Sequence, residues 1–66
     1  MRYHVSPREK EVLVLMCDGK SAQEIADILG LSVHTVRTHI DRLKDTFCVY
    51  KDTALVAAAL RAGIIS

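Results

Sequence analysis

This sequence of 66 residues has few of the residues that interrupt or cross-link a fold: one proline, three glycines, two cysteines and no tryptophan. Because half of its residues are hydrophobic, this composition is typical of a folded helical protein and excludes a disordered one. With one Phe and two Tyr, the core must be aliphatic. A chain this short buries only roughly 60% of its unfolded surface, which predicts a single domain over residues 1–66.

Metal, disulfide and membrane signals are also missing. Cys17 and Cys48 are far apart, with no other Cys or suitably spaced His to complete a zinc pattern. We expect both to behave as small buried hydrophobic side chains rather than as a disulfide. The sequence shows no signal peptide and no apolar run of the roughly 20 residues that a membrane span requires. These absences predict a reduced, cytoplasmic protein that does not enter a membrane.

Catalytic signals are absent as well. The sequence has no Gly-rich phosphate loop, no cysteine with a plausible catalytic partner and no paired carboxylates with a pocket around them. A core of this size also leaves no room for such a pocket. We therefore predict neither enzymatic activity nor a cofactor.

Helix start and stop signals predict an all-α fold of four helices. Ser6 and Ser21 are each followed three residues later by Glu, the pattern of a capping box. Pro7 suits the first position of a helix. The predicted helices run from Pro7 to about Cys17, from Ser21 to Gly30, from about Val33 to Phe47, and from Asp52 or Thr53 to Gly63.

Only Gly30, Leu31 and Ser32 separate the second and third predicted helices. Glycine tolerates the left-handed backbone of a tight corner, and Ser32 can cap the helix that follows. We expect Leu31 to fill the corner between the two helices. This arrangement is the signature of a helix-turn-helix.

The predicted third helix has one apolar and one polar face. Val36, Ile40, Leu43 and Phe47 recur at helical spacing and need a core. The far side and its flanks carry His34, Thr35, Arg37, Thr38, Asp41, Arg42, Lys44 and Asp45. The net charge is only +1, but the segment 32–51 has more basic than acidic residues. A helix divided in this way can place its polar face in the major groove of DNA.

The order of residues resembles the LuxR-type helix-turn-helix domain, which is also found in GerE-like and NarL/FixJ-type regulators. The resemblance covers about Val5 to Ile65 without an insertion. It rests on Pro7-Arg8-Glu9, Glu11-Val12-Leu13, Gly19-Lys20-Ser21, Glu24-Ile25-Ala26, Leu29, Ser32, Thr35-Val36-Arg37, His39, Val49 and Ala62-Gly63-Ile64-Ile65. It implies a four-helix domain whose third helix reads the major groove and whose fourth helix often mediates dimerisation.

The same resemblance suggests roles for individual residues. Arg37 matches a basic residue that approaches bases or phosphates, and Thr38 matches a groove-facing neighbour. Ser32 and Thr35 match phosphate-contacting positions. Some positions depart from the family pattern and lack its positive charge: Asp41, Asp52, Gln23 and the run Thr46-Phe47-Cys48, which stands where Lys-Leu-Gly is usual. These departures predict weaker phosphate binding per monomer than in a typical member.

The remaining polar residues of the third helix allow more than one interpretation. His34 and Arg42 are either DNA contacts or solvent-exposed side chains, and Lys44 is a phosphate contact or a bystander. Asp41 and Asp45 are expected to tune or restrict DNA binding, and the spacing of Arg42 and Asp45 favours an ion pair between them. Alternatively, this face meets a protein. His39, outside this set, is expected to be partly buried and hydrogen-bonded within the fold.

The fourth predicted helix has almost no polar face, because Arg61 is the one charged residue between Ala54 and Ala62. Its apolar surface is either bland or meets a second copy of the chain. The residues assigned to such a dimer interface are Leu55, Val56, Ala59 and Leu60.

Two functions from different classes therefore remain. The first is a sequence-specific transcriptional regulator that binds double-stranded DNA as a homodimer. The second is a protein-interaction module that forms a heterodimer with another regulator and binds little DNA itself. Acids on the third helix and the near-neutral net charge motivate the second interpretation.

Overall fold

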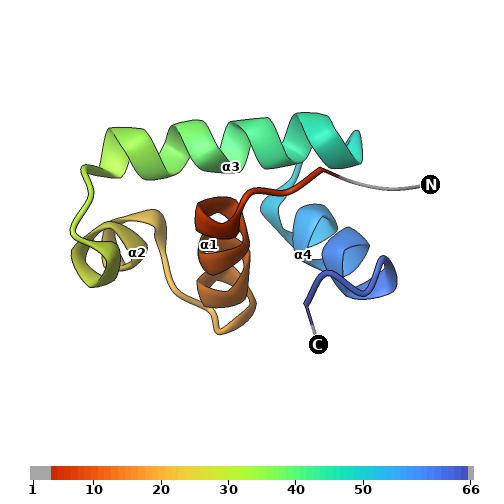
Figure 1. The fold of residues 1–66 in the computed structure, drawn as a ribbon, viewed down its shortest axis with the longest axis horizontal. Helices are drawn as coiled ribbons and strands as arrows, with labels where there is room; N and C mark the ends of the chain where they lie inside the picture. The colour runs from red at the N-terminus through yellow and green to blue at the C-terminus, as the bar shows by residue number, and fades with distance from the viewer. Residues whose placement is uncertain (1–3, 66) are drawn as a thin grey trace.

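The computed structural model describes residues 4–65, which form four helices and no strand. These are α1 (Pro7–Cys17), α2 (Ala22–Leu29), α3 (Val33–Phe47) and α4 (Asp52–Arg61). The all-α prediction and the helix bounds are confirmed, except that α4 ends slightly before Gly63. Residues 1–3 and 66 of the predicted domain lie outside the described residues. Figure 1 shows α3 along one edge of the molecule, with the other three helices on the same side of it.

Serine side chains cap the first three helices, as predicted. The Ser6 hydroxyl accepts from the Glu9 N–H at 3.2 Å, while the Glu9 carboxylate accepts from the Ser6 N–H at 3.0 Å. Ser21 and Glu24 form the same reciprocal pair at 3.2 and 2.9 Å. These contacts satisfy N–H groups that have no partner within the helix. The capping boxes therefore fix where α1 and α2 begin.

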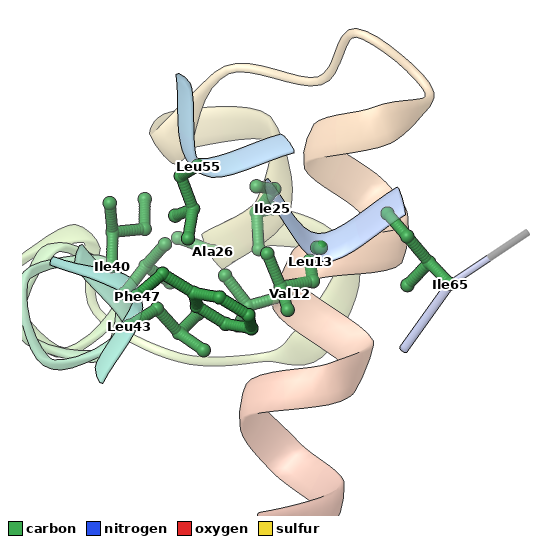
Figure 2. Close-up of a cluster of buried hydrophobic side chains, with 11 residues drawn as sticks. Val12, Leu13, Ile25, Ala26, Ile40, Leu43, Phe47, Leu55 and Ile65 are labelled. Atoms are coloured by element: carbon green, nitrogen blue, oxygen red, sulfur yellow. The ribbon is translucent and has the colours of Figure 1, made fainter. Parts of the chain in front are cut away.

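All four helices contribute to one aliphatic core. Its buried members are Val12, Leu13, Ile25, Ala26, Val36, Ile40, Leu43, Phe47, Leu55, Ala59 and Ile65. The predicted apolar stripe of α3 lies wholly within it. Figure 2 shows Leu43 and Phe47 of α3 pointing towards Val12 and Leu13 of α1. Burial of this stripe fixes the rotation of α3 about its axis, so the opposite face points away from the domain.

The corner between α2 and α3 has the predicted geometry. Gly30 adopts a left-handed backbone with φ +69°, and the Leu31 N–H donates to the Ala26 carbonyl at 2.9 Å. Leu31 is half-buried and packs against the core. The short turn thus places α3 at a steep angle to α2.

The expectation that both cysteines are buried is wrong. Cys17 and Cys48 are free thiols and both are exposed, because they lie at the ends of α1 and α3 rather than in helix centres. In α2, Ile28 is 55% exposed, whereas Ile25 and Ala26 are fully or almost fully buried and face the core.

Candidate nucleic-acid interface

The candidate site is the face of α3 that points away from the other three helices (Figure 1). His34, Arg37, Asp41, Arg42 and Asp45 are exposed on it, and Thr35 and Thr38 are half-buried. One helix of 15 residues carries all seven side chains. Since its opposite stripe is buried in the core, this face forms an exposed ridge along the outside of the domain.

The ridge begins at a hydrogen-bonded pair of hydroxyl residues. The Ser32 hydroxyl accepts from the Thr35 N–H at 3.1 Å, and the Ser32 and Thr35 hydroxyl oxygens lie 2.9 Å apart. Both residues stand at the N-terminal end of α3, where the helix dipole favours an anion. The structure therefore brings together the two residues that were predicted to contact phosphate.

Arg37 lies one turn further along the ridge and is exposed, with no acidic partner among residues 4–65. Its planar guanidinium is suited to bidentate contact with guanine or phosphate. The Thr38 hydroxyl donates to the His34 carbonyl at 3.0 Å, which leaves its oxygen as an acceptor. His34 itself is exposed in the first turn.

The predicted pair between Arg42 and Asp45 is not formed, and that prediction is wrong. The ion pairs of residues 4–65 are Arg8–Glu11 and Lys44–Asp52. Arg42 and Asp45 are both exposed, where a pair gains little energy and costs side-chain entropy. Asp41 and Asp45 therefore present unpaired carboxylates on this face.

Lys44 has a partner that the sequence analysis missed. Its ammonium lies 2.7 Å from the Asp52 carboxylate, and its side chain is only 23% exposed. Asp52 is the first residue of α4, so the contact joins the last turn of α3 to the start of the next helix. The sequence did contain a signal for this pair: an acidic residue, Asp52, stands at the start of the fourth helix, a few residues after Lys44.

His39 lies beside the apolar stripe of α3 and is half-buried, as expected. Its Nδ1 is buried, however, and no described residue forms a hydrogen bond with it. The expected hydrogen bond within the fold is therefore absent at this atom.

The candidate dimer residues of α4 divide into two pairs. Leu55 and Ala59 are completely buried in the core of the domain, so their side chains are not available to a second copy. Their inclusion in the interface is corrected, because α4 needs this face to pack on α1 and α3. Val56 is half-buried and Leu60 is 44% exposed. These two residues retain an accessible apolar surface.

Residues 4–65 contain neither a metal-binding cluster nor a helix that could span a membrane. No group of three or more His, Cys, Asp or Glu side chains there is placed to hold a metal ion. No helix of this part of the chain is both long enough and apolar enough to span a membrane.

Comparison with known proteins places this geometry in a family context. Residues 4–59 match the model of bacterial regulatory proteins of the luxR family, GerE. The transcriptional regulatory protein MctR of Rhizobium johnstonii is 37% identical over 62 residues, which cover 94% of this chain and 29% of MctR. This chain thus spans under a third of that relative.

Solved structures agree with the sequence match. The transcription factor GerE superposes with a TM-score of 0.91 at 29% identity, covering 98% of this chain and 97% of GerE. A VqmA–ligand–DNA complex from Vibrio cholerae gives a TM-score of 0.89 at 33% identity, covering 97% of this chain and 28% of VqmA. The four-helix arrangement is therefore a GerE-like fold.

Proposed function

Because the chain belongs to the LuxR family of bacterial regulatory proteins, we propose that it binds double-stranded DNA by inserting the outward face of α3 into the major groove. The family comprises DNA-binding domains of transcription regulators, and the chain is not an enzyme. The observation that carries the proposal is the exposed polar ridge of α3, which no other described helix covers (Figure 1). A helix about 10–12 Å across fits a groove about 12 Å wide.

The side chains along the ridge suggest that different parts of α3 contact different parts of the duplex. Ser32 and Thr35, at its N-terminal end, bind a phosphate and set the position of the helix on the duplex. Arg37 reads a guanine edge or holds a phosphate, and Thr38 contacts a neighbouring base. His34 contacts the duplex from the first turn of the helix, where recognition helices approach bases.

The second half of the ridge has a mixed charge. Arg42 is exposed and provides a further cation for the duplex. Asp41 is repelled by phosphates, so its place in a groove is next to a cytosine amino group, which donates to a carboxylate. The acids thereby make binding depend on sequence more than on bulk charge.

A homodimer is the assembly that we propose for the bound state. Val56 and Leu60 on α4 supply the accessible apolar surface for a two-fold contact. The two recognition helices would then meet half-sites about one helical turn apart, roughly 34 Å along the duplex.

Selection of bound sequences from a random pool of DNA duplexes tests the proposal. Enrichment of an inverted repeat is the expected result, because a two-fold dimer reads the same half-site twice. Enrichment of a single half-site would support DNA binding by the domain but contradict the proposed dimer. If no sequence is enriched and the domain does not retard DNA at low salt, DNA binding is excluded.

The second candidate function remains a protein-interaction module that pairs with another regulator. It is favoured by the unpaired Asp41 and Asp45 on the ridge and by the net charge of +1. Absence of DNA binding together with formation of a heterodimer through α4 would support it.

A further inference from the structure

We propose that Asp52 limits the affinity of this domain for DNA by holding the Lys44 ammonium away from the phosphate backbone. The inference rests on the proposed DNA binding by α3. Lys44 Nζ lies 2.7 Å from the carboxylate of Asp52, which belongs to α4 and lies outside the recognition helix.

Lys44 and Asp52 each lie at a helix end that stabilises the charge they carry. Lys44 lies in the last turn of α3 and Asp52 in the first turn of α4. A cation is stabilised at a helix C-terminus and an anion at a helix N-terminus, because the helix dipole has the opposite sign there. The ion pair therefore adds to the favourable interaction that each of the two charges already has with its own helix dipole.

The connection between the two helices is short and well hydrogen-bonded. The Val49 N–H donates to the Lys44 carbonyl at 3.0 Å, and the Leu55 N–H donates to the Lys51 carbonyl at 2.9 Å. With the backbone fixed on both sides, the Lys44 side chain reaches Asp52 without a rearrangement of the loop. The side chain of Lys44 is 23% exposed and that of Asp52 is 63% exposed.

This pair borders the proposed DNA-binding face. Ala22, Arg37, Ile40, Asp41, Lys44 and Asp52 line one shallow hollow beside α3. The two cations and two carboxylates in it carry no net charge. A phosphate that approaches Arg37 therefore meets a neutral surface rather than two free cations. Asp52 offsets the charge of the Lys44 ammonium and holds it on the α4 side, so the carboxylate competes with DNA for the same cation.

Replacement of Asp52 by Asn tests the competition on the duplex obtained by selection. We expect Asp52→Asn to tighten binding about three- to tenfold between about 50 and 200 mM salt, the gain from one added phosphate contact. The slope of log K against log[salt] should become steeper by about 0.9. Circular dichroism melts establish that each variant is folded.

Two controls separate competition from simple repulsion between Asp52 and DNA. The first repeats Asp52→Asn in a Lys44→Met background, where no ammonium can be released and the steeper slope should be absent. The second is Asp18→Asn, which makes the same change of charge at an exposed acid following α1; it should leave the slope unchanged.

Three outcomes overturn the inference: no change in Asp52→Asn, an equal gain in the Lys44→Met background, or an equal gain in Asp18→Asn. Failure of the wild-type domain to bind any duplex would instead overturn the proposed function, and this inference with it.

Discussion

Ser32 and Thr35 are joined twice at the start of α3: the Ser32 hydroxyl accepts from the Thr35 N–H at 3.1 Å and lies 2.9 Å from the Thr35 hydroxyl. The first contact is the cap of the helix, and the second orients a hydroxyl group at its positive end. One pair of small side chains thus supports the fold and prepares the end of the ridge that we propose to bind phosphate.

Ser32→Ala removes both contacts and should lower the free energy of unfolding by about 1 kcal/mol. Thr35→Val keeps the capping N–H and removes only the hydroxyl of residue 35. It should therefore lower the free energy of unfolding clearly less than Ser32→Ala does. Urea denaturation of the two variants makes the comparison. Equal losses would show that the cap does not contribute in the way described.

The capping box of α2 predicts a dependence of stability on pH. The Ser21 backbone N–H, and then its hydroxyl, hold the pKa of Glu24 below its ordinary value of 4.5. Because the folded state favours the ionised carboxylate, this contribution is present above about pH 4.5. It is lost as the pH falls through the lower folded pKa.

Glu24→Gln isolates this effect, since Gln preserves the shape of the capping box but does not titrate. Wild type should be the more stable protein at neutral pH, and the difference should disappear in acid. Thermal melts of both proteins from about pH 7 to about pH 3 measure this difference in stability. A difference that is constant with pH would mean that the charge of Glu24 plays no part.

Cys48 is the one non-glycine residue with a positive φ among residues 4–65, at +56°. A side chain in this left-handed conformation costs roughly 1–2 kcal/mol, and glycine avoids that cost. Cys48→Gly should therefore stabilise the domain by about 1 kcal/mol. Cys17→Gly is the matched control; Cys17 ends α1 with a helical backbone, so glycine there should destabilise. A stability change of the same sign in Cys48→Gly and Cys17→Gly would contradict the assignment of strain to the backbone of Cys48.

Leu60→Glu tests the proposed contact between two copies. The side chain is 44% exposed, so a charge there should leave the monomer folded and prevent an apolar two-fold contact. Sedimentation velocity with the selected duplex is expected to show two copies of the wild-type domain on each DNA and one copy of the variant. Arg61→Glu introduces an acid at the adjacent exposed residue and serves as control. An unchanged mass for Leu60→Glu would place the interface elsewhere.

Local signals made the helices predictable. Ser6–Glu9 and Ser21–Glu24 are complete capping boxes within four residues, and the apolar stripe of α3 has a clear helical period. The polar face of α3 followed from that stripe, since burial of one side of a helix exposes the other.

The features that were missed depend on contacts between helices. The period of α4 is hidden because nearly every residue is apolar, so Leu55 could not be distinguished from Leu60 as core or surface. Lys44 and Asp52 meet only because α3 and α4 fold back on each other. Cys48 was expected to be buried by its residue type, but its place at a helix end decides its exposure.

The central claim is that the outward face of α3 binds DNA through specific side chains, and Arg37→Ala tests it most directly. Loss of a bidentate contact costs about 1–3 kcal/mol, which corresponds to a dissociation constant raised by at least about fivefold. Fluorescence anisotropy at a fixed salt concentration on the selected duplex makes the measurement. Arg8→Ala removes an exposed arginine of α1 that already pairs with Glu11, and it should bind as wild type does. Equal affinity of Arg37→Ala and wild type would contradict the account.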